Sequence, residues 1–418
     1  MEEVLSAVVK PRVLLLTQWF DPEPTFKGLV FARELVRQGF DVEVVTGFPN
    51  YPGGKVYPGY KIKWIQRERI DGVDVTRLPL YPNHDQSAIK RVLNYASFAA
   101  SALFYGLFMA KRANVMYAYH PPLTVGIAAS LIRWIRGIPL VYDIQDMWPD
   151  TLRATDMLNN PRALALVGRV CDWVYRRVDL LVVLSPGFKR LLVQRGVPES
   201  KIEVIYNWAD ESALMAPVGC LSPSFPGADR FKIVFAGNMG KAQALDAVLG
   251  AAVILKGRVS QVSFVMLGGG VEVARLSDRA KELGLDNVVF LPPVSMAEVG
   301  TVLAAADALL VHLRKDPLFE ITIPSKTQAY MAVGKPLLMA VNGDAADLVM
   351  QSNSGLTAES ENSVALADAA QQLADMPLAD LQAMGSRARQ FYQERLGLEV
   401  GAGRFGAIFR ALANVVKG

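Results

Sequence analysis

Apolar runs of strand length alternate with helix-like patterns along the first half of the chain. The runs lie at residues 12–20, 41–47, 113–120, 138–146 and 178–185, and an amphipathic pattern at 29–39 ends at Gly39. Strands that are apolar along their whole length are typical of parallel sheets covered on both faces. The pattern therefore predicts a doubly wound α/β domain.

The pattern is interrupted at residues 215–230, where three prolines and two glycines lie in a stretch without a period. Such a composition indicates a linker. Strand-like runs then resume at 231–240, 262–270, 287–293, 307–313 and 335–341, with helical patterns at 244–257 and 363–376. We expect an N-terminal domain at 1–214, a second Rossmann-like domain at 231–395, and a C-terminal helix at 396–418 that packs back on the first. Ligands of such folds bind at the carboxyl ends of the strands, here in a central cleft between the domains.

The segment 90–112 has 19 largely apolar residues between a basic pair at each end. Its length approaches that of a membrane span. However, Asn94, Ser97 and Ser101 recur at helical spacing, and a spanning helix would interrupt the predicted sheet. The sequence favours a buried or interfacial helix. The basic pairs and the aromatic residues suggest contact with a membrane surface, and a plain core helix is the alternative.

The composition, the cysteine spacing and the net charge limit the classes of protein to which this chain can belong. Of the 418 residues, 51% are hydrophobic and 20% charged, which is typical of a globular protein long enough for two cores. Cys171 and Cys220 have no metal-ligand spacing, and the amino terminus does not have the order of a secretory signal, so we expect a cytoplasmic protein. The net charge of +4 is too small and too dispersed for a nucleic-acid footprint.

Several loops at predicted strand ends are suited to binding anions. At 320–336, a helix start with Pro324, Ser325 and Lys326 would present free backbone amides and one cation. Glycine-containing loops follow other predicted strands, and G-x-G-x-x-G is absent from them. Alone, each loop is an ordinary turn or capped helix; together they indicate a diphosphate or nucleotide ligand. The remaining candidates are Lys27, Gly28, Gly237, Asn238, Gly240, Lys241, Gln243 and Gly268.

The chain resembles a bacterial family 4 glycosyltransferase of the GT-B fold, in the branch that builds O-antigen, capsule and colanic-acid-type exopolysaccharides. The resemblance runs from about residue 12 to about residue 410 and lies in the motifs "PNYPGGKVYPGY", "YHPPL", "DMWPD", "AGNMGKAQALDAVLGAA", "LGLDNVVFLPPV" and "IPSKTQAYMAVGKPLL".

This resemblance implies transfer of a hexosyl-type sugar from a UDP- or GDP-sugar to a hydroxyl of a lipid-linked saccharide. It further implies retention of configuration, no metal, no cofactor besides the nucleotide-sugar co-substrate, and a peripheral location on the inner face of the cytoplasmic membrane. The second domain would hold the donor and the first the acceptor. His120 falls where the family has a histidine close to the donor sugar, and Asp146 would contact sugar or acceptor hydroxyls. A structural histidine and a loop-capping aspartate are the alternatives.

The sequence departs from the family pattern at two places. The family often has two glutamates seven residues apart, but the corresponding positions here are Ile321 and Ala329; Glu320 and Gln328, one residue earlier, have the same spacing. A shift of one residue rotates a helical side chain by about 100°. Where many relatives have an Arg and a Lys after the first strand of the second domain, this chain has Asn238 and Gln243, which leaves Lys241 and Lys326 as the cations for the diphosphate.

Two alternative functions remain open. A nucleotide-sugar epimerase on the same architecture would need clustered acids and histidines, and the chain has only His84, His120 and His312. A nucleotide-sugar-binding subunit without catalysis is favoured by Ala329, Asn238 and Gln243. For a transferase, no residue stands out as a nucleophile, so we expect front-face attack in which the donor β-phosphate takes the acceptor proton.

Overall fold

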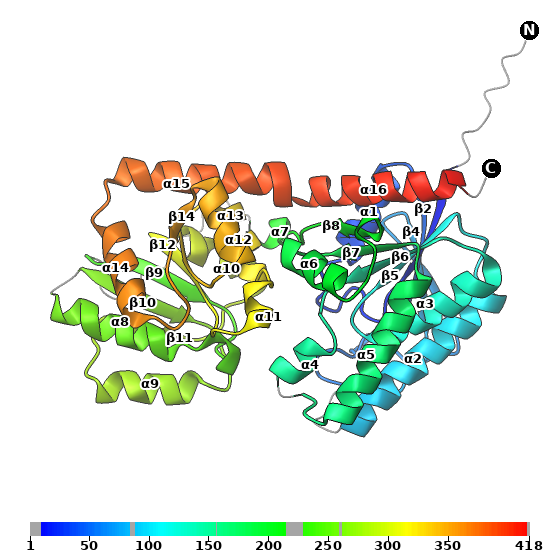
Figure 1. The fold of residues 1–418 in the computed structure, drawn as a ribbon, viewed down its shortest axis with the longest axis horizontal. Helices are drawn as coiled ribbons and strands as arrows, with labels where there is room; N and C mark the ends of the chain where they lie inside the picture. The colour runs from blue at the N-terminus through cyan, green and yellow to red at the C-terminus, as the bar shows by residue number, and fades with distance from the viewer. Residues whose placement is uncertain (1–9, 84–87, 156, 215–228, 259–260, 416–418) are drawn as a thin grey trace, which may run out of the picture. The chain divides into compact units, whose positions relative to one another are not determined.

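The computed structural model describes residues 10–83, 88–155, 157–214, 229–258 and 261–415 (Figure 1). The chain forms two compact units. Unit 1 comprises Met1–Leu184, Lys189–Ile205 and Leu398–Gly418, and unit 2 comprises Ser185–Phe188 and Tyr206–Gly397. The predicted linker lies almost wholly outside the described residues, as do His84 and Cys220. The predicted pair of Rossmann-like α/β domains is confirmed.

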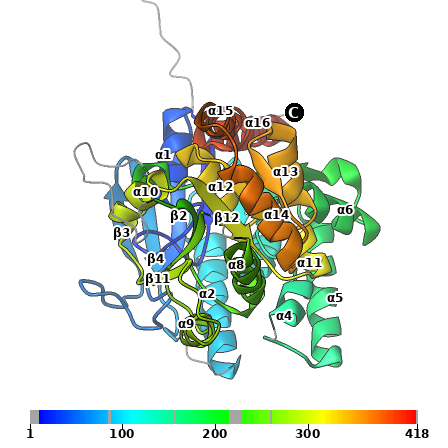
Figure 2. The ribbon, with the colours of Figure 1, turned by 90° about the vertical axis from the view of Figure 1, so that its left-hand side faces the viewer.

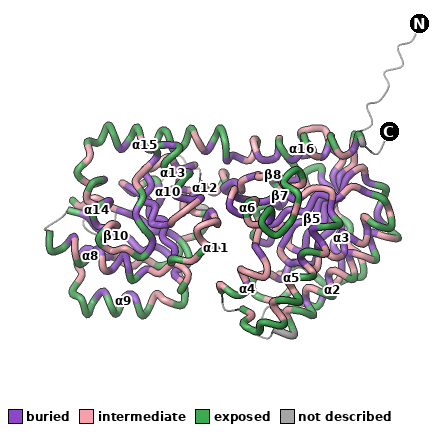
Figure 3. The backbone as a smooth tube through the Cα atoms, in the orientation of Figure 1, coloured by how far each residue is buried: buried purple, intermediate pink, exposed green. Residues whose placement is uncertain are grey.

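Unit 1 contains an eight-stranded sheet in the order β3-β4-β2-β1-β5-β6-β7-β8. All neighbours are parallel except β3 and β4. The central strands are buried along nearly their whole length, as their apolar sequences predict (Figure 3). The strands are β1 (Arg12–Leu16), β2 (Asp41–Gly47), β3 (Gln66–Ile70), β4 (Val73–Leu78), β5 (Val115–Tyr119), β6 (Leu140–Ile144), β7 (Leu180–Val183) and β8 (Ile202–Val204).

Helices cover both faces of this sheet. On one face α1 packs against α16, and on the other α2 packs against α3 and α3 against α5 (Figure 1). The helical elements of this region are α1 (Leu29–Arg37), α2 (Ala88–Phe108), α3 (Leu123–Arg136), α4 (Asp150–Ala154), α5 (Pro161–Arg177), α6 (Pro186–Gln194), η1 (Glu199–Lys201) and α16 (Leu398–Val415).

The antiparallel β3–β4 hairpin was missed by the sequence analysis. Its strands meet at Asp71 and Gly72, both with positive φ, as a two-residue hairpin turn requires. The Asp-Gly pair between two short alternating segments was the available signal. β3 itself lies at the sheet edge and alternates between half-buried and exposed residues, so it lacks the continuous apolar run of the other strands.

Helix α2 forms the apolar segment predicted at 90–112, and it ends at Phe108, before the second basic pair. Within the described residues, no helix has both the length and the apolarity of a membrane span. Its buried side includes Asn94, Phe98, Ala102 and Tyr105, which face the sheet and α3.

The C-terminal helix α16 belongs to unit 1. Phe405 is fully buried and packs edge-on against Phe31 of α1 (ring centroids 5.2 Å apart) and against Tyr117 of β5 (5.5 Å). Phe409 continues the contact, with its ring centroid 6.1 Å from that of Phe40. The last helix therefore completes the core of the domain that begins the chain.

Unit 2 contains a six-stranded, fully parallel sheet in the order β11-β10-β9-β12-β13-β14. Its strands are β9 (Phe231–Ala236), β10 (Val262–Leu267), β11 (Val288–Leu291), β12 (Ala308–His312), β13 (Leu337–Ala340) and β14 (Gly355–Thr357).

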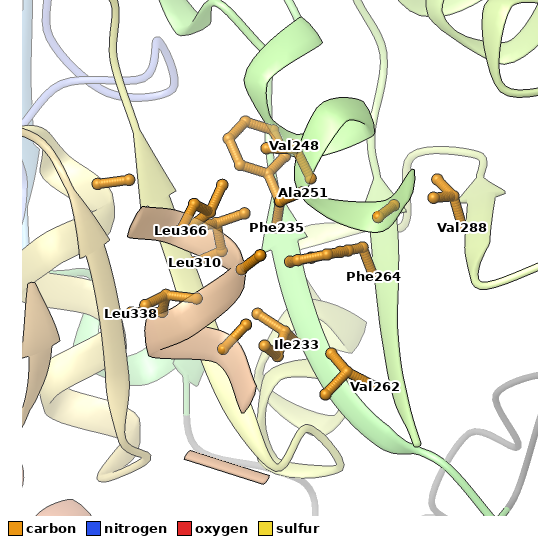
Figure 4. Close-up of a cluster of buried hydrophobic side chains, with 14 of the residues drawn as sticks. Ile233, Phe235, Val248, Ala251, Val262, Phe264, Val288, Leu310, Leu338 and Leu366 are labelled. Atoms are coloured by element: carbon orange, nitrogen blue, oxygen red, sulfur yellow. The ribbon is translucent and has the colours of Figure 1, made fainter. Parts of the chain in front are cut away.

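Two apolar clusters lie on the two faces of this sheet. One packs β9, β10, β12 and β13 against α8 and α14 and includes Phe235, Phe264 and Leu366 (Figure 4). The other packs the opposite face against α10, α12, α13 and α15. Figure 2 shows α8 and α12 on opposite sides of β12. The helical elements are α7 (Glu211–Leu214), η2 (Lys241–Gln243), α8 (Asp246–Gly257), α9 (Val273–Glu282), α10 (Met296–Ala304), α11 (Pro317–Glu320), α12 (Ser325–Val333), α13 (Asp344–Ser352), α14 (Ser363–Ala374), α15 (Leu378–Phe391) and η3 (Tyr392–Leu396).

We expect Phe405→Ala to lower the free energy of unfolding of unit 1 by about 3–5 kcal/mol, because it removes a fully buried ring and leaves a cavity between α1 and β5. Urea denaturation followed by circular dichroism measures the change. Ala407→Ser, at an exposed position of the same helix, is the control and should change little. Equal stability of the two variants would contradict the packing role of α16.

Candidate active site

Unit 2 has a topological switch point between β9 and β12. The chain leaves β9 toward β10 on one side and later enters β12 on the other. At such a point the loops after the two strands separate and leave a ligand crevice at the carboxyl edge of the sheet. The loop after β9 reaches across to β12: Arg314 N donates to Ala242 O (2.9 Å), and His312 Nδ1 lies 2.7 Å from Gln243 O. The predicted anion loop is thus held at the switch point.

Glycines shape the backbone at this edge. Gly237, Gly268 and Gly270 have φ of +127°, +136° and +141°, a region in which other residues are strained. A Cβ at Gly268 would lie 2.1 Å from Gly237 O, and one at Gly270 would lie 2.3 Å from Met239 O. The two loops are joined directly, since Gly237 N donates to Leu267 O (2.9 Å) and Met239 N to Gly269 O (2.7 Å). The loops after β9 and β10 therefore form one backbone frame.

Lys326 lies against this frame. It is the second residue of α12, and its Nζ lies 3.4 Å from the ring centroid of Phe235. A Cβ at Gly237 would meet Lys326 Cε at 2.8 Å, so a larger residue would shift the end of the lysine side chain, in addition to adopting a strained φ of +127°. Burial lowers the pKa of Lys326 to about 7, and no carboxylate of the described residues offsets this effect. An anionic ligand next to Lys326 would favour the charged form of its amine.

The start of α12 carries further donors. Its N-cap residue is Pro324, which has no side-chain group to bond the first amides of the helix. The first turn has no acidic residue. A helix N-terminus in this state favours anions. The helix start at Ser325 therefore lacks a side-chain cap, and Lys326 lies beside it.

Other predicted donor-binding residues in unit 2 have structural partners or lie exposed. Gln243 Oε1 accepts a hydrogen bond from Gly240 N (2.9 Å). The buried side-chain amide of Gln328 donates to Pro324 O (2.8 Å) and Ser325 O (3.2 Å), so it braces the turn that carries Lys326. Asn238 and Lys241 are exposed at the same loop. The two glutamine side chains therefore support the loop and the helix start.

The departures from the expected glutamate pair have a structural account. Ala329 packs against the apolar core of unit 2, where a carboxylate would be costly. Glu320 is half-buried at the end of α11, and its carbonyl lies so close to Gly343 that a Cβ there would be 2.1 Å away. The backbone of Glu320 therefore lies next to the loop after β13, and the position of Gln328 holds no acidic residue.

Unit 1 has a similar switch point between β1 and β5, and His120 directly follows β5. The ring is buried, with edge-on contacts to Tyr142 and Trp148 at centroid distances of 5.9 and 5.4 Å. Its backbone N donates to Asp143 O (3.0 Å), while its Nδ1 finds no hydrogen-bond partner among the described residues. Burial lowers the pKa of His120 to about 3, so the imidazole is neutral at physiological pH.

Two aspartates lie at the carboxyl end of β6, Asp143 within the strand and Asp146 just after it. Burial raises the pKa of Asp146, a predicted candidate, to about 6. Asp143, which the sequence analysis did not select, is buried and accepts hydrogen bonds from Tyr117 OH (2.6 Å) and Gln145 Nε2 (2.6 Å). Because Asp143 lies inside an apolar strand, the sequence did not indicate its hydrogen bonds to Tyr117 and Gln145, of which the bond to Tyr117 forms only when the chain folds.

Lys27 and Gly28 do not have the geometry predicted for phosphate ligands. Asp21 Oδ2 accepts from Leu29 N (2.6 Å), so a carboxylate of this chain already lies at the start of α1. Lys27 is 1% exposed; its Nζ lies 5.4 Å from the ring centroid of Phe405, and burial lowers its pKa to about 8 against the opposing effect of Asp143. Both residues serve the interior of unit 1.

A second feature missed from the sequence is the pair of loops held by Glu23. Its buried carboxylate accepts from Asn50 N and Tyr51 N (both 2.7 Å) and from Phe20 N (3.3 Å). The same arrangement brings the rings of Trp19 and Tyr51 to a centroid distance of 4.6 Å. The carboxyl ends of β1 and β2 thereby carry a half-buried aromatic pair, a surface suited to the C–H face of a sugar.

The described His, Cys, Asp and Glu side chains form no group of three or more that could hold a metal ion.

Comparisons with known proteins agree with this architecture. The family model "Glycosyl transferase 4-like domain" matches residues 29–208, and "Glycosyl transferases group 1" matches residues 223–391. A relative named for colanic acid biosynthesis, the glycosyl transferase WcaI of Escherichia coli K12, is 28% identical over 72% of this chain and 75% of its own. The glycosyltransferase WbjE of Pseudomonas aeruginosa is 25% identical over 74% and 77%.

Solved structures share the fold at low sequence identity. HepE of Anabaena in complex with UDP has a TM-score of 0.67 at 16% identity and covers 96% of this chain and 100% of its own. Sucrose-phosphate synthase of Thermosynechococcus elongatus has a TM-score of 0.72, also at 16% identity, with coverage of 97% and 100%.

The fold and the two matched domains define a glycosyltransferase of the GT-B type. Within that class, the chain belongs to family 4, with homologues in exopolysaccharide biosynthesis.

We expect Gly237→Ala to disturb the site more than the fold. The new methyl group would displace the end of the Lys326 side chain. The alanine backbone would also be held at a strained φ, which should lower the free energy of unfolding by about 1–3 kcal/mol. Gly257→Ala is the matched control, since a Cβ there meets nothing within 4 Å. Thermal unfolding and UDP binding by calorimetry, measured for both variants, separate the two effects; unchanged UDP affinity in Gly237→Ala would contradict the proposed frame.

Proposed function

We propose that the protein transfers a sugar from a nucleotide-sugar to a hydroxyl of a lipid-linked saccharide in surface polysaccharide assembly. Unit 2 binds the nucleoside diphosphate, and unit 1 binds the acceptor. The proposal is supported by the family membership, by one relative named for colanic acid biosynthesis, and by the UDP bound in the structural neighbour HepE.

The observation that carries the proposal is the state of Lys326. The half-buried Lys326, with no carboxylate partner among the described residues and next to the uncapped start of α12, loses hydration in its charged form, so it either gives up its proton or gains from binding an anion. A diphosphate supplies that anion. The glycine frame lets backbone approach the same region closely, as phosphate-binding loops require.

The same groups would stabilise the leaving group. When the bond between the anomeric carbon and the β-phosphate oxygen breaks, negative charge grows on the nucleoside diphosphate. Lys326 and the first amides of α12 are fixed before the reaction, so they need no rearrangement as the charge develops. Lys241 adds a flexible, exposed cation at the loop after β9.

In unit 1, His120 and Asp146 are the proposed contacts to sugar hydroxyls. A neutral imidazole both donates and accepts hydrogen bonds, and the low pKa of His120 keeps it in that form. The acceptor proton passes to the β-phosphate oxygen of the donor in front-face attack, which retains the anomeric configuration. We further propose that the reaction is independent of metal and occurs at the inner face of the cytoplasmic membrane.

The direct test is turnover of UDP- and GDP-sugars with a lipid-linked acceptor, measured as nucleoside diphosphate release together with the glycosylated product. We expect Lys326→Met to lower kcat by about 10²–10³, the usual effect of removing one preorganised donor. Lys281→Met, which removes an exposed lysine on α9, is the matched control. Free epimer without glycosylated product would indicate the epimerase, and binding without turnover would indicate the inactive subunit.

A pH experiment tests Lys326 without turnover. The pKa of about 7 in the free protein means that Lys326 is largely neutral at about pH 8, and a bound diphosphate favours the charged form. UDP binding should therefore take up a proton, and the affinity should fall as the pH rises above 7. Calorimetry in two buffers of different ionisation enthalpy measures the uptake. It should vanish in Lys326→Met and persist in Lys281→Met; the same uptake in both would assign the proton to another group.

A further inference from the structure

Helix α2 has a second apolar side that no part of the described chain covers. The exposed residues Val92, Ala96, Ala100, Phe104 and Phe108 follow one another at intervals of four, so consecutive members are neighbours and the stripe winds obliquely around the helix by about 160°. Phe108 is 73% exposed and Val92 62%. Exposed and buried residues alternate along α2 in Figure 3. An exposed apolar surface of this kind marks an interaction site.

A loop from another part of the sequence extends this surface. The ring of Trp64 packs edge-on against Phe104 (centroids 5.9 Å apart), and Phe104 contacts Phe108 (5.2 Å). Trp64 remains 68% exposed, and its neighbour Ile62 is 41% exposed. We call Trp64, Phe104 and Phe108 the aromatic ridge. The three rings contact one another in a row and remain exposed to water. Aromatic side chains are common at interfaces between water and hydrocarbon, so the ridge is suited to such an interface.

The two segments that form the ridge carry charges of one sign, and Lys111 also lines a pocket with Glu43, Glu68 and Asp74. Lys61 and Lys63 alternate with Ile62 and Trp64, and Lys111 and Arg112 follow the end of α2; all four cations are exposed. Segments 55–65 and 88–112 contain no Asp or Glu. Clustered Lys and Arg beside amphipathic helices are attracted to anionic headgroups, and their long side chains can reach those headgroups while the rings enter the acyl boundary.

We propose that the aromatic ridge, the α2 stripe and these four cations form a docking face for an anionic lipid bilayer. A second copy of the chain fits this face less well, because a symmetric contact would bring the same cations together. Docking through the ridge leaves the buried side of α2 packed in unit 1.

The other side of α2 connects this face to the candidate acceptor region. Asn94 accepts a hydrogen bond from Gln18 Nε2 (2.6 Å) and donates to Tyr81 O (2.7 Å), and its Nδ2 lies 3.4 Å from Asn50 Oδ1. Gln18 and Asn50 follow β1 and β2, next to the Trp19–Tyr51 pair. Docking through α2 would therefore fix the carboxyl edge of the unit 1 sheet with respect to the bilayer. The link between docking and the acceptor region depends on the proposed lipid-linked acceptor, whereas the docking face itself does not.

The test is cosedimentation of the full chain with vesicles of phosphatidylcholine, with and without phosphatidylglycerol. We expect binding to the anionic vesicles, and at least about tenfold weaker partitioning in Trp64→Ser/Phe104→Ser/Phe108→Ser. Val271→Ser/Val364→Ser/Leu378→Ser removes three exposed apolar side chains of unit 2 and is the matched control. Replacement of Lys61, Lys63, Lys111 and Arg112 by Gln should weaken binding about fivefold per cation at low salt.

Circular dichroism and UDP affinity, measured on every variant, show whether the fold and the unit 2 site are intact. The proposal is overturned if the wild type binds no anionic vesicles, if the control loses as much binding as the ridge variant, or if the ridge instead drives self-association in analytical ultracentrifugation. Vesicle binding that depends on the ridge, in a protein that neither binds nor turns over nucleotide-sugars, would support the docking face and contradict the proposed function.

Discussion

The contact of backbone with backbone at the carboxyl ends of β9 and β10 is the constraint on which the candidate donor site depends. Parallel strands bring all their carboxyl ends to one edge, but the loops can share that edge only where side chains are absent. Gly237, Gly268 and Gly270 provide this condition. The space left by the missing Cβ of Gly237 is taken by Lys326, so the position of this lysine depends on a glycine in another loop.

Loss of hydration shifts the pKa values of titratable groups in both candidate sites. Burial holds Lys326 near the point of losing its proton, keeps His120 neutral, and favours the protonated form of Asp146. Each effect costs folding free energy, because the charged form of the group loses hydration without full compensation. Perturbed groups also occur in purely structural networks, as Glu23 shows with its three backbone donors. Lys326 and His120 differ from Glu23 because the described chain does not satisfy them completely.

The sequence predicted the layers of the fold better than the roles of single residues. Continuous apolar runs gave the two parallel sheets, because strands covered on both faces must be apolar along their length. This criterion missed the β3–β4 hairpin, because β3 is a partly exposed strand at the edge of the sheet. Among the predicted site residues, Ser325 and Lys326 lie at the start of a helix as expected, because a helix start is a local feature of the sequence, and their role in binding stays a prediction. Lys27, Gln243 and Gln328 were assigned to the ligand, yet they contact their own unit, since side-chain direction depends on tertiary neighbours.

Helix α2 shows why hydrophobicity alone could not decide between a core helix and a membrane contact. Its buried side, with Phe98 and Ala102, is required by the packing of unit 1, whereas its exposed stripe contributes nothing to that packing. An ordinary surface helix would carry polar residues there. Both sides are apolar in this chain, so a sequence average approaches that of a spanning segment. The distinction came from tertiary contacts: Asn94 is buried within a hydrogen-bond network, while Phe104, which contacts Trp64, is exposed. One helix can thus serve the core and an interface at once, with the polar residue marking the side that belongs to the protein.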